Sequence, residues 1–268
     1  MLSKCLFSLQ ISLSFLKIAM NNTPNKEPYK KLELSFLESK DGSHTLLRHD
    51  LNETYHSHNG AIQESMWVFI DKGLNYLKEQ NYTSIKILEI GFGTGLNAIL
   101  AYQFAQKNKI EIEYISLEPL PVPLEITEKL NYTDFLEEES KTIFNELHRV
   151  DWEKKHQISP YFSLHKIETT LEDYKNSSDN NFESQSDYNI ENYFDCTFYD
   201  AFAPSKQAEV WQLSNLQKVF NLTKENGILV TYCAQGQFKR DLKTAGWTVE
   251  SLDGAPPKRE MVRAVKPI

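Results

Sequence analysis

The glycine-rich segment Ile87–Asn97, ILEIGFGTGLN, constrains this chain more than any other part of its sequence. A short apolar run leads into Gly91, Gly93 and Gly95, and a helical pattern follows directly. Glycine tolerates the positive φ angles of a tight turn and lets backbone approach a ligand, because it has no Cβ. The free N–H groups at the start of the next helix favour an anionic group. The segment therefore predicts a strand, a turn and a helix that cradle a cofactor.

The hydrophobic pattern around this segment predicts an open α/β sheet. Residues 85–90 and 112–117 read as strands on either side of a helix, which makes a βαβ unit. Further strands are expected at 161–165, 194–199, 227–233, 247–252 and 261–265. The last two are joined by GAPPK, which has no room for a helix, so this pair should be antiparallel. A seven-stranded, mostly parallel sheet with an antiparallel last strand resembles the Rossmann-like class I S-adenosylmethionine-dependent methyltransferase fold.

An extension is expected ahead of this sheet. LELSFLE alternates between apolar and polar residues and is followed by an Asp-Gly turn, so residues 31–59 should form a hairpin extension. Apolar residues recur at helical spacing between residues 60 and 80, where the methyltransferase domain, 60–268, should begin. The polar stretch 175–193 is expected to be a surface loop.

Residues 1–30 are expected to be a disordered or mis-started N-terminus. The first twenty have the outline of a secretory signal peptide, with a basic residue before an apolar run. Gln10 and Lys17 interrupt that run, which is also too short to span a membrane. A polar stretch typical of a cytosolic N-terminus follows Met20, so export is the minor alternative.

Charge and cysteine content narrow the classes of partner. The 29 Lys and Arg residues against 37 Asp and Glu give a formal charge of −8, so any contact with nucleic acid must be local. Cys5, Cys196 and Cys233 contain no CxxC pair, which argues against a disulfide framework and a zinc site. We therefore expect a cytoplasmic protein that binds neither metal nor membrane.

The spacing of the glycines bears on the cofactor. The dinucleotide fingerprint is GxGxxG, whereas the third glycine here comes one residue early, as GxGxG. Glu118 ends the second strand, where a carboxylate can accept both hydroxyls of an adenosine ribose. Glu89 precedes the turn and is a candidate to engage either the cofactor's ammonium group or the neighbouring loop. Asn97, at the start of the helix, is a further candidate cofactor-binding residue. The alternative is a strand-turn-helix junction whose glycines serve packing alone.

Asp200 is the candidate catalytic residue. It lies in FDCTFYDAFAPSKQAEVW, at the carboxyl end of an expected strand, where open α/β sheets bind ligands. A nitrogen methylated by a sulfonium must aim its lone pair at the methyl group, and a carboxylate that accepts an amine hydrogen orients it. The alternative role for Asp200 is a helix N-cap or a brace for its loop.

Three motifs together resemble one family. GFGTGLN, the Asp200 segment DAFAPSK followed by Trp211, and the late GAPPKREM are similar to the methyltransferase module of the MnmC type, including its free-standing MnmD forms. The resemblance covers roughly residues 50 to 266. It implies S-adenosylmethionine-dependent N-methylation of the amine of 5-aminomethyl-2-thiouridine at wobble position 34 of tRNA. Gly91, Gly93, Gly95 and Glu118 would then form the cofactor site, with Asp200 as the active-site carboxylate.

The resemblance also implies contact with the tRNA anticodon loop. A wobble base can be splayed into a pocket and stacked on an aromatic face, for which Phe202 is the candidate, although it would equally suit a core plug. Lys206, Lys258 and Arg259 are the other candidate substrate-binding residues. The wider basic cluster, which is equally explained as solvated charge, comprises Lys239, Arg240, Lys243, Lys258, Arg259, Arg263 and Lys266.

Two departures from the family pattern stand out. Bifunctional members of the family continue into a flavin-dependent oxidase domain. The present sequence stops at Ile268, so no flavin and no oxidase activity are expected of it. Where the family tends to carry an acid for the adenine amine, this sequence has Thr169 and Thr170, with Glu172 or Asp173 as substitutes. The segment YHSHNGAIQES resembles the family's active-site mouth, but His56 and His58 are interpreted as structural hydrogen-bonders.

Three other functions remain open from the sequence. A methyltransferase of a small amine or other metabolite would suit the negative charge. A nicotinamide-dependent oxidoreductase would bind nicotinamide and not S-adenosylmethionine. A catalytically silent nucleotide-binding module would function without Asp200. The oligomeric state is left undetermined.

Overall fold

The structure is a computed structural model that describes residues 32–137, 139–175 and 191–268. The N-terminus interpreted as disordered or mis-started, with Cys5, lies outside the described residues, as does most of the loop expected at 175–193. Residues Glu33–Ile268 form one compact unit. Within the part of the chain that is described, no helix is long and apolar enough to cross a membrane.

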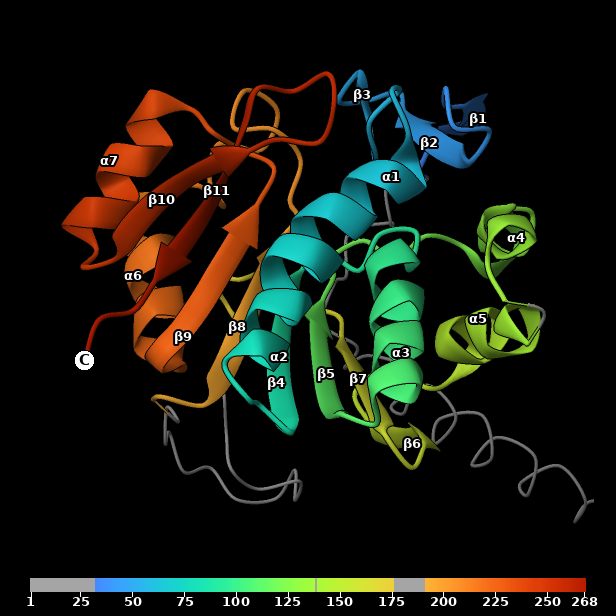
Figure 1. Cartoon of the computed structure of the whole chain (residues 1–268). Helices are drawn as coiled ribbons and strands as arrows, with labels where there is room; N and C mark the ends of the chain where they lie inside the picture. Colours follow the sequence, from blue (N-terminus) through green and yellow to red (C-terminus); the bar gives the residue numbers. More distant parts are fainter. Residues whose placement is uncertain (1–31, 138, 176–190) are drawn as a thin grey trace, which may run out of the picture. The chain divides into compact units, whose positions relative to one another are not determined.

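A central sheet organises this unit. Its strand order is β10-β11-β9-β8-β4-β5-β7-β6, and its strands are β4 (Ser84–Ile90), β5 (Glu111–Leu117), β6 (Lys155–Ser159), β7 (Phe162–Ile167), β8 (Phe194–Tyr199), β9 (Thr223–Thr231), β10 (Thr248–Asp253) and β11 (Glu260–Val265). Strands β7, β5, β4, β8 and β9 pair in parallel. Strand β11 runs antiparallel to both β9 and β10 (Figure 1), so the reversed last strand is confirmed.

The sheet has eight strands where the sequence predicted seven. The additional strand, β6, lies at one edge and pairs antiparallel with β7. Its sequence, KHQIS, contains one aliphatic residue, and its side chains are exposed or half-buried. An edge strand can be largely polar because it need not pack both faces in the core, so this strand carries no hydrophobic run to detect.

Helices cover the two faces of the sheet. The helix expected at 60–80 is present as α1 (Ala61–Ser65), a π-helical segment η1 (Met66–Asn75) and α2 (Tyr76–Glu79). It packs on the same face as α3 (Leu96–Asn108) (Figure 1). The remaining helical segments are α4 (Leu124–Thr127), the 3-10 segment η2 (Tyr132–Phe135), α5 (Ser140–Arg149), α6 (Leu213–Leu222) and α7 (Gly236–Thr244).

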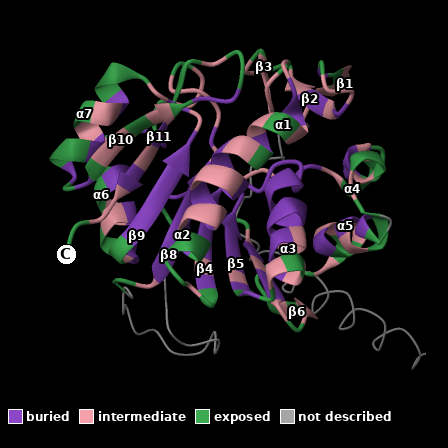
Figure 2. Ribbon diagram, in the orientation of Figure 1, coloured by how far each residue is buried: buried purple, intermediate pink, exposed green. Residues whose placement is uncertain are grey.

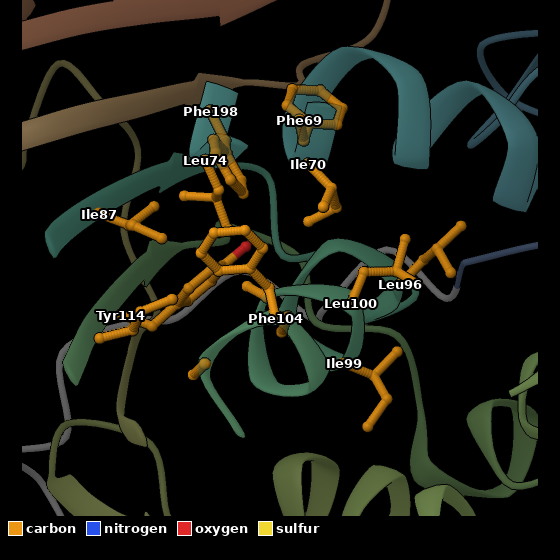
Figure 3. Close-up of a cluster of buried hydrophobic side chains, with 14 of the residues drawn as sticks. Phe69, Ile70, Leu74, Ile87, Leu96, Ile99, Leu100, Phe104, Tyr114 and Phe198 are labelled. Atoms are coloured by element: carbon orange, nitrogen blue, oxygen red, sulfur yellow. The ribbon is translucent and has the colours of Figure 1, made fainter. Parts of the chain in front are cut away.

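The alternation of side chains along the strands divides the core into two layers. Ile87 packs with helices η1 and α3, whereas Leu88 packs with α6 and α7 on the opposite face. Figure 2 shows the central strands buried along most of their length. Figure 3 shows Tyr114 and Phe198 from the sheet pointing toward Phe69 and Leu74 of η1 and the α3 side chains. Burial of this apolar surface therefore holds the sheet between two layers of helices.

The N-terminal extension is a small sheet of three antiparallel strands, β1 (Leu34–Glu38), β2 (His44–Arg48) and β3 (Glu53–Thr54). The Asp-Gly turn of its hairpin caps helix α1: Asp41 Oδ2 accepts the Gln63 N–H at 3.1 Å, and Ser39 Oγ accepts the Ala61 N–H at 3.3 Å. These bonds satisfy helix donors that otherwise lack partners. They tie the small sheet to the start of α1.

Candidate functional site

A cavity of about 350 Å³ lies at the carboxyl ends of β4, β5 and β8. Its walls come from the glycine turn, the segment after β3, the start of α1, the loop after β8, and Lys258 between β10 and β11. The carboxyl edge of an open α/β sheet is where such folds bind ligands. The cavity volume lies within the range of small-molecule and cofactor pockets, about 300–1,000 Å³.

The glycine turn adopts backbone conformations that side chains disfavour. Gly91, Gly93 and Gly95 have φ values of 95°, 50° and 73°. A Cβ on Gly91 would lie 3.0 Å from the carbonyl oxygen of Asp200, and one on Gly95 would lie 2.7 Å from His148 Nε2. Gly91 and Gly93 line the cavity, whereas Gly95 lies behind it and turns the chain into α3. The turn therefore offers bare backbone to a ligand at two of its three glycines.

Glu118 faces the cavity from the end of β5. Its carboxylate accepts the Gly93 N–H at 3.0 Å and the Leu120 N–H at 2.9 Å, and the residue is 8% exposed. Burial raises its pKa, and the two backbone donors oppose that rise. Glu118 thus ties the glycine turn to β5 while it remains on the cavity wall.

Asp200 lies beside the turn, directly after β8. Its N–H donates to Ile90 O at 3.2 Å, and its Oδ2 accepts from Asn97 Nδ2 at 2.8 Å. Burial raises the pKa of Asp200 to about 7, against the lowering effect of the Asn97 hydrogen bond. Glu64 raises this pKa further, and Lys258 lowers it. A carboxyl group with such a pKa exists in both protonation states near neutrality.

Glu89 and Asn97, two of the predicted cofactor-binding residues, differ in their relation to the cavity. Glu89 is fully buried and does not line the cavity; its Oε2 accepts from Ser116 Oγ at 2.5 Å. Burial raises its pKa to about 8. Asn97 reaches the cavity wall, but its amide contacts Asp200. The structure therefore groups Asn97 with the candidate catalytic carboxylate and leaves Glu89 beneath the cavity floor.

Two aromatic residues, Tyr55 and Phe202, line the cavity. Phe202 is half-buried in the cavity and meets Tyr55 edge-to-face, with ring centroids 4.9 Å apart and an interplanar angle of 69°. The guanidinium of Arg48 lies 5.5 Å from the Phe202 centroid. Trp211 Nε1 donates to Phe202 O at 2.8 Å and fixes the loop. Phe202 therefore presents a ring to the cavity instead of plugging the core.

The predicted basic residues differ in what they contact. Lys206 lines the cavity, and its Nζ donates to the backbone oxygens of Leu51 and Asn52 at 3.0 and 3.2 Å. Lys258 also lines it, pairs with Glu64 at 2.5 Å and lies 4.5 Å from the Tyr232 centroid. Arg259 is exposed and is not part of the wall. Lys206 and Lys258 thus line the cavity, and each already has a partner within the chain.

The cavity wall carries more acids than bases. Its cationic side chains are Arg48, which pairs with Asp50 at 2.9 Å, and the two engaged lysines. Its acidic side chains are Glu53, Glu64, Glu118, Glu172, Asp200 and Glu209. This balance favours ligands that carry positive charge. No group of three or more His, Cys, Asp or Glu residues suited to a metal ion occurs in the described ranges.

Several wall residues were not predicted as site residues. Tyr55 packs against Gly93, where a Cβ would lie 3.0 Å from Tyr55 Cδ1. His56 Nε2 lies 2.6 Å from Thr94 Oγ1, and burial lowers its pKa to about 4, so it braces the turn as a neutral group. Thr169 and Thr170, which the sequence placed near the expected adenine position, also line the cavity. The segment YHSHNGAIQES was a signal for Tyr55, but its contact with Phe202 depends on the packing of distant loops.

Several known proteins are similar to this chain in sequence or in fold. Residues 144–267 match a family of S-adenosyl-L-methionine-dependent methyltransferases. The chain is 28% identical over 247 residues to the tRNA 5-methylaminomethyl-2-thiouridine biosynthesis bifunctional protein MnmC of Actinobacillus pleuropneumoniae, and 27% identical over 230 residues to that of Legionella pneumophila. These matches cover 87% and 80% of this chain but 36% and 34% of the relatives. The chain thus spans about a third of their length.

A solved structure has the same fold. The crystal structure of MNMC2 from Aquifex aeolicus matches with a TM-score of 0.67 and 24% sequence identity, covering 90% of this chain and 74% of that one. The family match and the MnmC relatives indicate a methyltransferase that uses S-adenosylmethionine, and the Aquifex structure has the same fold. Within that class it is related to the MnmC proteins.

Proposed function

We propose that the chain methylates the primary amine of 5-aminomethyl-2-thiouridine at wobble position 34 of tRNA. The observation that carries this proposal is the placement of Asp200. Its carboxyl group lies on the wall of an acidic cavity, beside the glycine turn, with the aromatic pair of Tyr55 and Phe202 in the same wall. Such a substrate requires a group that accepts a hydrogen bond from its amine and an aromatic surface on which its base can stack.

The residues of the turn fit the cofactor. S-adenosylmethionine, when bound, supplies an electrophilic methyl group on a sulfonium. Gly91 and Gly93 leave bare backbone on the cavity wall, and a Cβ would lie 3.0 Å from Asp200 O at Gly91 and 3.0 Å from Tyr55 Cδ1 at Gly93. Glu118 presents its carboxylate to the ribose hydroxyls from the end of β5. Thr169 and Thr170 lie on the wall where the adenine would be expected, with Glu172 beside them.

Asp200 would then act on the amine. Its ionised form accepts one amine hydrogen, which orients the nitrogen lone pair toward the methyl donor. The same carboxylate takes the proton that the nitrogen gives up as the N–C bond forms. A pKa of about 7 suits this task, because a general base works best when its pKa lies near the operating pH. The acids around it attract an aminomethyl group in its protonated form, which must first release one proton to water before its lone pair is free.

A second candidate is methylation of a small amine or other metabolite. Ion pairs between C-terminal cations and acids of the chain favour this candidate. Lys239 pairs with Glu260 at 2.8 Å, and Arg263 pairs with Glu250 at 2.7 Å. Paired cations leave less positive charge for phosphates. The net charge of −8 acts in the same direction.

The deciding experiment is methyl transfer from labelled S-adenosylmethionine to bulk tRNA from cells that lack this modification, followed by nucleoside analysis. We expect the label in 5-methylaminomethyl-2-thiouridine, incorporated about 10²-fold or more slowly by the Asp200→Asn variant. Label in a small amine but not in tRNA would replace this proposal by the second candidate. A salt titration of tRNA binding adds an independent measurement, because affinity should fall as salt rises when phosphates are contacted.

A further inference from the structure

The part of the cavity wall that carries Phe202 is assembled from two loops that lie far apart in the chain. One is the hairpin loop 49–52, which connects β2 and β3. The other is the loop 200–212, which connects β8 and α6. Residues of both loops line the cavity, and neither loop is part of the central sheet. The position of one loop relative to the other therefore depends on the contacts between them.

Lys206 makes the polar contact between these loops. Its Nζ donates to Leu51 O at 3.0 Å and to Asn52 O at 3.2 Å. The hairpin loop is a closed turn, because Asn52 has a φ of 47° and its N–H donates to His49 O at 3.2 Å. A lysine ammonium has three donors, and two of them bind this turn. Lys206 thus fastens the loop 200–212 to the hairpin.

Phe202 and Lys206 belong to one closed turn within the loop 200–212. The Lys206 N–H donates to Ala203 O at 2.7 Å, which closes the turn directly after Phe202. The carbonyl oxygen of Phe202 accepts from Trp211 Nε1 at 2.8 Å, and Trp211 is buried. A shift of the lysine relative to the hairpin would therefore displace the backbone that carries the Phe202 ring.

The ring of Phe202 meets two residues that flank the hairpin loop. Arg48 is the last residue of β2, and Tyr55 follows β3 directly. The Tyr55 ring centroid lies 4.9 Å from that of Phe202, and the Arg48 guanidinium lies 5.5 Å from it. The aromatic pair thus spans the same two loops that Lys206 joins.

The charges near Lys206 do not favour a phosphate group. Glu53 follows the hairpin loop, Glu209 lies in the same loop as the lysine, and both line the cavity. These two acids repel a phosphate that approaches this part of the wall. To bind one, the ammonium would also have to give up the carbonyl oxygens of Leu51 and Asn52.

We infer that Lys206 is a positioning residue: its bonds to Leu51 O and Asn52 O join the two loops and hold Phe202 against Tyr55. Lys206 acts on the substrate through this aromatic pair and not through a tRNA phosphate. A base that stacks on Phe202 then meets a ring that is already in place, which lowers the cost of ordering on binding. The inference rests on the proposed stacking role of Phe202.

Steady-state kinetics with tRNA test this role. Lys206→Met removes the donors and keeps the aliphatic stem, whereas Lys206→Arg keeps donors for both carbonyl groups. We expect KM for tRNA to rise about tenfold in Lys206→Met, as for the loss of a stacked ring, and at most about threefold in Lys206→Arg. The Kd for S-adenosylmethionine should stay within about twofold in both variants. Lys154→Met controls for the loss of one positive charge, because Lys154 is exposed and does not line the cavity.

A double substitution shows whether Lys206 acts through Phe202. In the Phe202→Ala background, Lys206→Met should raise KM no more than about twofold further, because two residues that act as one unit are not additive. A salt titration of tRNA binding separates the alternative. The slope of log Kd against log salt should be the same in Lys206→Met and the wild type, whereas loss of a phosphate contact reduces it by about one.

Fluorine NMR gives a result that does not depend on the substrate. With 4-fluorophenylalanine in place of Phe202, the signal of the free protein reports the packing of this ring. We expect Lys206→Met to move the signal at least about halfway toward its position in urea-unfolded protein, because the neighbouring Tyr55 ring shifts it only while the two are in contact. Lys206→Arg and Lys154→Met should leave it in place.

Three results would overturn the inference. An unchanged fluorine signal in Lys206→Met would show that the lysine does not hold the ring. A full tenfold rise in KM in the Phe202→Ala background would show that it acts on the substrate by another route. A salt slope reduced by about one would make Lys206 a phosphate contact. A wild-type protein that methylates no tRNA would refute the proposed function, and the fluorine spectra would still decide the role of Lys206.

Discussion

Replacing Asp200 by asparagine should lower activity and raise stability, and the stability gain should depend on pH. Burial raises the pKa of Asp200 from 3.8 to about 7. The unfolded chain therefore releases this proton near pH 4, whereas the folded protein keeps it until about pH 7. The stabilising contribution of the group is fully present below the lower value and is lost as pH rises through the higher one.

The magnitude follows from the size of the shift. Three pKa units correspond to a ceiling of about 4 kcal/mol at alkaline pH, because one unit is worth about 1.4 kcal/mol. Asparagine stays neutral and still accepts the hydrogen bond from Asn97 through Oδ1. Since Asp200 faces a cavity that water can enter, we expect the variant to gain about 1–3 kcal/mol at pH 8 and clearly less at pH 5. Turnover should fall by about 10²-fold or more.

Urea denaturation at pH 5 and pH 8, together with a methyl-transfer assay, tests both parts. Asp253→Asn is the matched control, because Asp253 is exposed at the end of β10; it should leave turnover and both unfolding free energies unchanged. An equal stability gain for Asp200→Asn at the two pH values would refute the desolvation argument. Unchanged turnover would refute the role of Asp200 as proton acceptor.

Three further substitutions test the walls of the cavity. Gly93→Val should abolish calorimetrically measurable S-adenosylmethionine binding, because φ is 50° and the new Cβ would lie 3.0 Å from Tyr55 Cδ1; normal binding would mean that the turn is not the cofactor site. Glu118→Gln should weaken that binding by about 10- to 100-fold, the usual cost of a hydrogen bond to a charged group, and an unaltered Kd would remove Glu118 from the site. Phe202→Ala should raise KM for tRNA about tenfold while the cofactor Kd stays constant, since stacking a base is worth about 1–3 kcal/mol; the proposed stacking role fails if KM does not change.

Much of the fold was predictable because its signals are local. The strands β4, β5, β7, β8, β9, β10 and β11 were each predicted from short apolar runs. The short GAPPK connection predicted the antiparallel last pair. Strand β6 was not predicted, because an edge strand needs no apolar run and KHQIS has none.

The candidate site was predictable only in part. The sequence placed the glycine turn, Glu118 and Asp200 at the carboxyl edge of the sheet, and the structure brings them around one cavity. It also grouped Glu89 with the cofactor residues, because Glu89 precedes the turn. In the folded protein Glu89 is buried beside Ser116 and Tyr114 of β5, and it does not line the cavity.

What the sequence by itself determined is therefore the glycine turn and the strand-helix alternation, because periodicity and turn chemistry act over a few residues. Tertiary structure alone decided the partners of the polar side chains. Lys206 donates to backbone oxygens of Leu51 and Asn52, about 155 positions earlier in the chain, and so braces a loop while it lines the cavity. Asn97 reaches Asp200 across 103 positions. Such contacts depend on how helices and loops pack over the sheet, and no local pattern encodes them.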